Sequence, residues 1–116
     1  MSLNEGKLTE IEKVLNKMKN AGIPGGLVRS DGVLIKATIA LGDVGPTIIA
    51  RAANISDAML RREGNTQKEV EIGFETDTIV IVPISTYLFF GIAKTKEEKK
   101  SVLEFSHEME GVLENV

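Results

Sequence analysis

Two segments in the second half of the chain are apolar at nearly every position. Residues 79–82 read IVIV, and residues 87–93 read YLFFGIA. A strand that is apolar on both faces is typical of the middle of a sheet, where a layer of structure covers each face. The remaining sequence must therefore supply helices for two faces of a sheet.

Three segments have the periodicity of amphipathic helices. In residues 4–21 the apolar positions recur at spacings of three and four, and Gly22 follows as a stop signal. Residues 46–63 form the second segment, which begins at a proline, a residue favoured at the first position of a helix. Thr95 and Glu98 form a capping box, which predicts the start of the last helix.

Three more segments complete the sheet. Residues 26–30 and 33–39 are expected to be strands joined by a turn at Ser30-Asp31-Gly32, because Asp-Gly tolerates the positive φ of hairpin turns. Residues 67–75 alternate between polar and apolar positions, as a strand with one wet face does. We expect Pro83 to end the strand that precedes it, because proline cannot donate to a central ladder.

The predicted order is therefore helix-strand-strand-helix-strand-strand-strand-helix. Hairpin links make the five-stranded sheet antiparallel, and three helices must cover its two faces. The simplest solution is a three-layer α/β/α arrangement of the α+β class, with the middle helix on one face and the terminal helices on the other. A length of 116 residues suits a single domain, residues 1–116.

The composition excludes several classes of function. The chain has no cysteine, which excludes disulfides, zinc–thiolate sites and thiol catalysis and fits a cytoplasmic location. Its net charge is −3 and its basic residues are interleaved with acids, so nucleic acid is not an expected partner. No apolar run is long enough to predict a membrane span.

No group of residues predicts catalysis. His107 is the only histidine, and one imidazole without cysteines makes a poor metal site. The glycines of residues 25–32 lack the spacing and the lysine of a phosphate-binding loop, and the loop before the middle helix lacks that lysine as well. We therefore expect no enzyme activity, no metal and no cofactor.

The pattern of residues 46–75 points instead to an interaction surface. Strand 67–75 is a plausible sheet edge, and the apolar stripe of the helix before it spans roughly 160°, more than one packing surface needs. A two-fold axis at this edge would pair the strand with its own copy and pack two middle helices together. The surplus flank of the helix consists of Ile49, Ala53, Ser56 and Leu60. In the alternative interpretation, Glu69 and Glu71 are gatekeepers that prevent this edge from pairing.

The element order and several motifs together resemble the roadblock/dynein light-chain family. The similar segments, in chain order, are GGLVRSDGVLIKAT, TIIARAANISDAMLRREG, KEVEIGFE and TIVIVPIS…YLFFGIA. The resemblance covers about residues 5 to 115 and is to small, free-standing archaeal and bacterial members. It implies a profilin-like fold and a homodimer with no catalytic machinery or cofactor. Such dimers act as platforms for small Ras-like GTPases, in some cases as regulators of nucleotide hydrolysis.

The resemblance also implies which residues form the dimer seam and which bind a partner. The dimer seam would combine the third strand with the flank of the middle helix, through Glu69, Val70, Glu71, Ile72, Gly73, Phe74, Ile49, Ala53, Ser56 and Leu60. The partner-binding face would be the exposed side of the paired middle helices, through Arg51, Asn54, Ala58, Arg61 and Arg62.

Two other functions fit the same pattern. The chain could be a small-molecule sensor with a ligand between sheet and helix, although the candidate lining residues are mostly aliphatic. It could also be a purely structural scaffold subunit that has no influence on nucleotide turnover. Arginine supplied in trans to a GTPase is a further possibility for the middle helix, because arginine stabilises the charge of phosphoryl transfer.

Overall fold

The computed structural model describes residues 3–39, 45, 47, 49–54, 69–73 and 76–114. The elements, in chain order, are α1 (Glu5–Asn20), β1 (Gly25–Arg29), β2 (Leu34–Ala37), β3 (Val70–Gly73), β4 (Thr78–Ile84), β5 (Tyr87–Ala93) and α3 (Lys96–Leu113). Residues 49–54, between β2 and β3, are helical as well. The strands form one five-stranded antiparallel sheet in the order β2-β1-β5-β4-β3, which confirms the predicted sheet.

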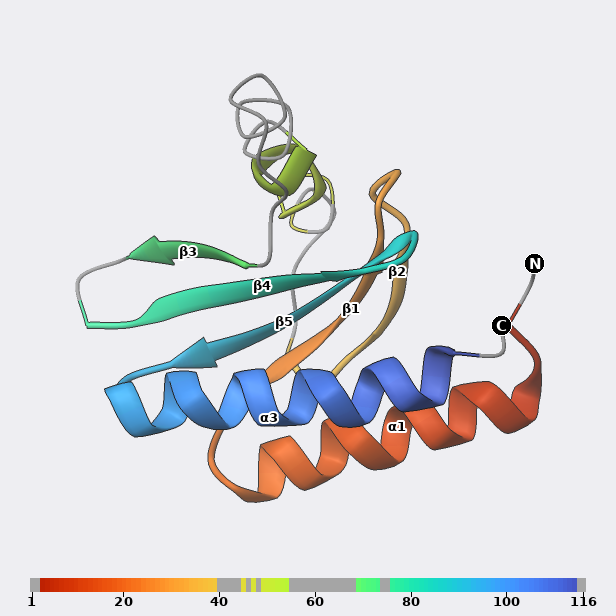
Figure 1. Cartoon of the computed structure of the whole chain (residues 1–116), viewed down its shortest axis with the longest axis horizontal. Coiled ribbons are helices and arrows are strands. Elements are labelled where there is room, and N and C mark those ends of the chain that lie inside the picture. Colours follow the sequence, from red (N-terminus) through yellow and green to blue (C-terminus); the bar gives the residue numbers. More distant parts are fainter. Residues whose placement is uncertain are drawn as a thin grey trace.

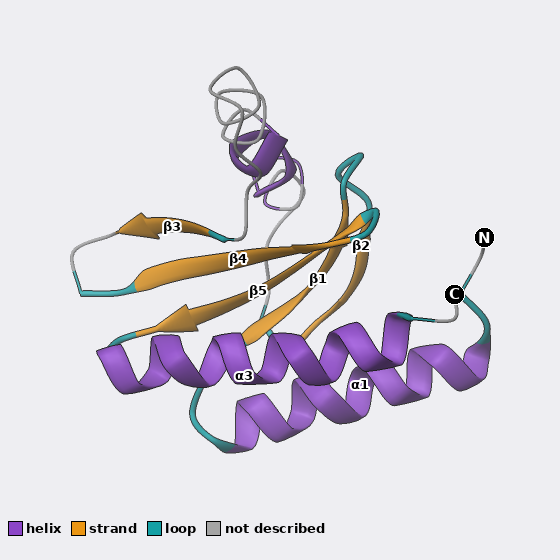
Figure 2. Ribbon diagram, viewed as in Figure 1, coloured by secondary structure: helices purple, strands orange, loops and turns teal. Residues whose placement is uncertain are grey.

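The molecule has the predicted three layers. Figure 1 shows α1 and α3 side by side on one face of the sheet and the helical segment 49–54 on the other. The same division is clear in the secondary-structure colouring of Figure 2. One core cluster joins α1 and α3 to side chains such as Phe89, and a second joins segment 49–54 to side chains such as Phe90. Neighbouring phenylalanines of β5 thus enter opposite cores, as the alternation of a central strand requires.

The two long helices end and begin where the sequence predicts. At the end of α1, Gly22 takes a φ of +87° and its N–H donates to Lys19 O, while Ile23 N–H donates to Met18 O. This pair of bonds is a Schellman motif, and buried Ile23 packs in the same core as Met18. At the start of α3, Glu98 N–H donates to Thr95 Oγ1 at 3.0 Å, which confirms the predicted cap.

The β1–β2 hairpin is confirmed, with a local irregularity. Gly32 supplies the positive φ of the turn, at +95°, while Asp31 does not. The register shifts between Leu27 and Val28, so β2 carries a bulge opposite that point. The described strand Leu34–Ala37 is accordingly shorter than the predicted 33–39.

The expectation that Pro83 ends its strand is wrong, because β4 continues to Ile84. Pro83 pairs with Leu88 of β5, whereas the described residues of β3 pair with β4 only as far as Ile81. Proline lacks an N–H, but here that position points away from β5 and lies beyond the described end of β3. No ladder bond of β5 is lost, so proline is tolerated.

Glycines in the two central strands allow a close approach of neighbouring elements. A Cβ on Gly25 would lie 2.3 Å from both Met18 Cε and the carbonyl oxygen of Phe90, and one on Gly91 would lie 2.7 Å from Val102 Cγ2. The absence of a side chain at Gly25 therefore lets α1 and β5 pack closely against β1.

Candidate binding surface at the β3 edge

The sheet has two edge strands, β2 and β3. Residues 70–73 of β3 pair with β4 on one side in an unbroken register, from Val70 opposite Ile81 to Gly73 opposite Thr78. The described residues place no strand on the other side. The prediction that strand 67–75 lies at an edge is therefore confirmed for its described residues.

The hydrogen-bond alternation of the sheet shows which backbone groups of β3 point outward. Ile92 N–H donates to Pro24 O and Ser30 N–H donates to Thr86 O, so the even-numbered residues of β5 direct their backbone groups toward β1. Carried across the antiparallel pairs, this alternation directs Val70 and Ile72 toward β4. The outward N–H and C=O groups on β3 belong to Glu71 and Gly73.

The side chains of β3 divide between the two faces of the sheet. Val70 and Ile72 are half-buried and pack with the core under segment 49–54. Glu71 points to the opposite face, where its Oε1 lies 3.1 Å from Lys99 Nζ of α3. This ion pair supplies a cation beside Glu71 from within the chain. A partner for Glu71 on α3 was not predicted from the sequence, because the order of residues does not say which turn of α3 covers β3.

The other edge is less suited to pairing. The bulge in β2 disturbs its flat surface, and Lys36 on that strand forms an ion pair with Glu12 at 2.8 Å. Bulges and lysines are typical of edge strands protected against pairing. Val33 and Leu34, at its start, are exposed large apolar side chains. Within the described residues, β3 is thus the more regular edge.

Two residues of the predicted flank of the middle helix, Ile49 and Ala53, lie in segment 49–54, and both are buried within the chain itself. Ile49 and Ala53 were expected to form a surplus flank for a second copy, but they are 4% and 1% exposed and lie in the core with Ala50. A stripe wider than one contact surface does not reveal which of its sides faces the sheet. These two residues are therefore packed inside the single chain.

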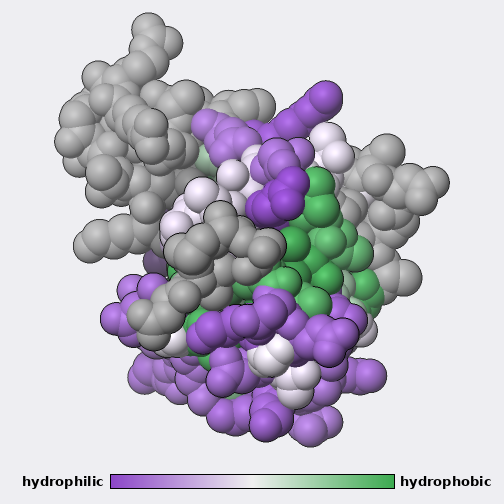
Figure 3. All heavy atoms as spheres, turned by 90° about the vertical axis from the view of Figure 1, so that its right-hand side faces the viewer, coloured by the Kyte–Doolittle hydropathy of each residue, from purple (hydrophilic) through white to green (hydrophobic). Residues whose placement is uncertain are grey.

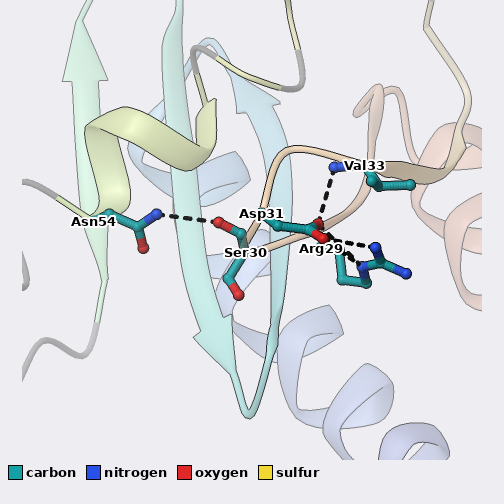
Figure 4. Close-up of polar contacts among 5 residues, drawn as sticks. All are labelled: Arg29, Ser30, Asp31, Val33 and Asn54. Carbon is teal, nitrogen blue, oxygen red and sulfur yellow. Dashed lines mark hydrogen bonds and ion pairs between the residues drawn. The ribbon is translucent and has the colours of Figure 1, made fainter. Parts of the chain in front are cut away.

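The outward side of the same segment carries two of the residues expected to bind a partner. Arg51 and Asn54 are both exposed. Asn54 is held in place, because its Nδ2 donates to Ser30 O at 3.1 Å (Figure 4). Asn54 therefore fastens the end of the described helix to the β1–β2 turn, while Arg51 stays on the open surface.

The turn that receives Asn54 is itself ordered by an ion pair. Arg29 Nη2 lies 2.6 Å from Asp31 Oδ2, and Asp31 Oδ1 also accepts Val33 N–H at 3.3 Å (Figure 4). The hydrogen bond from Arg29 is the main cause that lowers the pKa of Asp31 below its ordinary value, and the same contact raises the pKa of Arg29. Both groups are exposed, so solvent screens the pair.

Several predicted site residues lie outside the described part of the chain: Ser56, Ala58, Leu60, Arg61, Arg62 and Phe74. Among the described residues, no group of three or more acidic, histidine or cysteine side chains is arranged to hold a metal ion. None of the described helices is both long enough and apolar enough to cross a bilayer.

Sequence comparison and structural comparison give different results. No protein-family model matches the sequence, and no curated protein is significantly similar to it. Among solved structures, the gliding protein MglB of Thermus thermophilus superimposes with a TM-score of 0.84 at 14% identity, over 100% of this chain and 97% of that one.

Two further structures agree with this result. MglB of Myxococcus xanthus matches with a TM-score of 0.81 at 16% identity, over 99% of this chain and 96% of that one. A Roadblock/LC7 domain of Streptomyces avermitilis matches with a TM-score of 0.63 at 10% identity, over 93% of this chain and 92% of that one. Likeness at such low identity establishes the architecture, and the chain therefore has the fold shared by MglB and the Roadblock/LC7 domain.

Proposed function

We propose that the protein is a non-enzymatic, cytoplasmic homodimer that binds a small Ras-like GTPase and regulates it. The observation that carries the proposal is the regular open edge of β3 beside the helical segment 49–54, in a chain with the MglB and roadblock fold. The choice of a Ras-like GTPase as the partner rests on the resemblance of the sequence to the roadblock/dynein light-chain family, whose members bind such proteins.

The described residues favour one register for a two-fold pairing of β3 with its copy. If Ile72 faces Ile72 of the partner subunit across the axis, Glu71 lies opposite Gly73 of the partner subunit. A pairing centred on Glu71 would instead oppose two like charges, which is destabilising. A Cβ on Gly73 would meet nothing within 4 Å, so there is space beside it for the glutamate. The paired isoleucines would extend the apolar face under the helical layer.

Solution mass tests the dimer. Proline at position 71 removes an N–H that points away from β4, so Glu71→Pro should give a monomer while β3 stays paired with β4. Glu71→Gln removes the same charge and the ion pair with Lys99 but keeps the N–H, and it should stay dimeric. A wild-type protein that is monomeric at micromolar concentration, or a Glu71→Pro dimer as stable as the wild type, would show that β3 is not the seam.

A binding experiment tests whether a Ras-like GTPase binds to the outward side of segment 49–54. Arg51→Glu reverses a charge on the outward side of segment 49–54 and should weaken capture of a Ras-like GTPase from the same organism. Lys13→Glu makes the same charge change on the exposed side of α1, the opposite layer, and should bind normally. Equal binding by both variants and wild type would place the contact elsewhere.

Nucleotide turnover separates a regulator from a scaffold. A GTPase-regulating dimer should change the rate of GTP hydrolysis by the bound GTPase when it is added in excess. Binding with an unchanged rate would favour the purely structural scaffold. Stabilisation of the chain by a metabolite in a thermal-shift screen, without any GTPase, would favour the sensor function instead.

A further inference from the structure

A surface cleft lies away from the β3 edge, between the last turns of α3 and the β4–β5 hairpin. Its volume is about 610 Å³, and it is lined by Pro83, Ile84, Ser85, His107, Glu110, Gly111, Leu113 and Glu114. Figure 3 looks onto this end of the molecule, where hydrophilic residues dominate the lower part of the view, the side of the helical layer. The cleft is on the α1–α3 side and shares no residue with the surface proposed above.

The C-terminal end of α3 carries negative side chains, although the helix dipole makes a negative charge unfavourable there. The last turn contains no basic residue, and Glu110 and Glu114 stand where the free carbonyls already make the helix end negative. Glu108, on the neighbouring side of the helix, is matched by Lys17 at 2.6 Å. Among the described residues, neither Glu110 nor Glu114 has a lysine or arginine within ion-pair distance. The lining also contains His107, whose Nδ1 lies 4.0 Å from Glu110 Oε2 and which carries a charge only when it is protonated. With a neutral imidazole, the cleft keeps a negative potential that no lysine or arginine of the described residues offsets.

The chain itself shows that this helix end accepts an ammonium group. Lys7 of α1 donates from Nζ to the carbonyl oxygen of Val112 at 2.8 Å, in a part-buried position. The same Nζ lies 3.4 Å from a carboxylate oxygen of Glu10. An ammonium held between a carbonyl at the helix end and a carboxylate is the arrangement that a second cation could adopt on the other side of the helix.

The floor of the cleft is open for a close approach. Gly111 lies in the last turn of α3, and glycine is less favourable in a helix than alanine. A Cβ there would meet nothing within 4 Å, so no contact within the described residues requires the glycine. Beside it, half-buried Pro83 and the small exposed parts of Ile84 (8%) and Leu113 (6%) form the apolar part of the wall. Methylene stems of lysine and arginine pack on such walls while their charged ends reach carboxylates.

We propose that this cleft binds a basic segment of a partner protein. Lysine or arginine side chains of the segment lie along Pro83 and Leu113 and bring their charged ends to Glu110 and Glu114. The backbone of the segment crosses over Gly111. Charge complementarity selects this occupant, because the lining carries two carboxylates, no lysine or arginine, and one histidine that is uncharged unless protonated.

The probe is a fluorescein-labelled hexa-arginine peptide, with a hexa-glutamate peptide as the control for the label. The wild-type protein should bind the first by fluorescence anisotropy and not the second, and the affinity should fall as salt is raised. Glu110→Gln/Glu114→Gln should weaken binding about tenfold, as expected when two partly exposed ion pairs are lost. Gly111→Trp, which fills the cleft without a change in charge, should weaken it as well.

The matched control variant removes the same number of negative charges from the same helix, at positions outside the cleft. Glu97 and Glu104 are exposed residues of α3 outside the cleft, so Glu97→Gln/Glu104→Gln should bind within about twofold of wild type. Equal losses in the two double variants would mean attraction by net charge alone and would overturn the site. So would unchanged binding by Gly111→Trp in a variant with wild-type circular dichroism, or the absence of saturable binding by wild type. Backbone amide shifts confined to residues 83–85 and 107–114 would confirm the location, whether or not the chain is dimeric.

Discussion

At the scale of single residues, glycines in β1 allow neighbouring elements to approach closely. The two glycines at the start of β1, Gly25 and Gly26, lie inside the strand and are buried. A Cβ on Gly26 would lie 2.7 Å from Lys36 O and 2.8 Å from Ala37 Cβ of the neighbouring strand. The need for glycine at this position arises from residues about ten positions away and so could not be read from the local sequence.

Gly25→Ala should strongly destabilise the protein. The added methyl group would collide with the Phe90 carbonyl oxygen, a backbone atom that cannot move aside cheaply, and overpacking of this kind costs about 1–3 kcal/mol or more. Gly111→Ala is the matched control, because its methyl group enters open space and alanine favours a helix by about 1 kcal/mol. Chemical denaturation should give a lower midpoint for the first variant and an equal or higher one for the second. A neutral Gly25→Ala would contradict the close packing of α1, β1 and β5.

The ion pair in the β1–β2 turn makes a prediction about pH. The pKa of Asp31 is lowered from its ordinary value of 3.8, chiefly by the hydrogen bond from Arg29, so its charged form is favoured in the folded state. The resulting stabilisation is present above that ordinary value and is lost as the pH falls through the lowered pKa. A carboxyl-carbon NMR titration should give a midpoint for Asp31 below 3.8 in wild type and a higher one in Arg29→Gln. Equal midpoints in the two proteins would show that the pair does not form in solution.

At the scale of elements, the sheet, the layers and the local start and stop signals were predicted well, whereas the buried side of segment 49–54 and the end of β4 were not. The cap at Thr95 and the stop at Gly22 depend on residues a few positions apart, and both were found as predicted. The sequence pattern does not say from which direction the sheet approaches a helix, and Ile49 and Ala53 of the predicted flank lie in the core of the chain. Pro83 failed as a stop signal because the rule depends on whether a neighbouring strand needs its N–H.

The capping box of α3 can be tested by removing its hydroxyl. Thr95→Ala leaves the N–H of Glu98 without its side-chain acceptor and should destabilise the protein by about 1 kcal/mol. Thr9→Ala is the matched control, because that hydroxyl only donates to the Glu5 carbonyl within α1 and alanine is the better helix former there. Thermal unfolding should show a clear decrease in Tm for Thr95→Ala alone. Equal values of Tm for the two variants would mean that the cap adds nothing to the stability of α3.

At the scale of the whole molecule, the layer order places the two proposed surfaces apart. Figure 1 shows the helical segment 49–54 on one face of the sheet and α1 and α3 on the other. The side chains of Val70 and Ile72 pack on the first face, while the cleft is lined by the end of α3 on the second. The sequence predicted the layers because strands that are apolar on both faces require them. It could not predict the cleft, because the cleft brings the β4–β5 turn against the end of a helix that is more than twenty residues away in the chain. A chain built this way can pair through its sheet edge and still leave the opposite layer open.

If β3 is the seam, stability should depend on protein concentration. A dimer that forms only from folded chains is stabilised by mass action, so the Tm of wild type should rise as the concentration is raised. Glu71→Pro removes the outward N–H and should unfold at a Tm that does not change with concentration, whereas Glu71→Gln should keep the wild-type dependence. In the proposed register, Glu71 lies opposite Gly73 of the partner subunit, and no like charges face each other directly. Salt should therefore have little effect on how Tm depends on protein concentration. A dependence that becomes much steeper at high salt would instead indicate a seam in which the glutamates of the two copies are opposed.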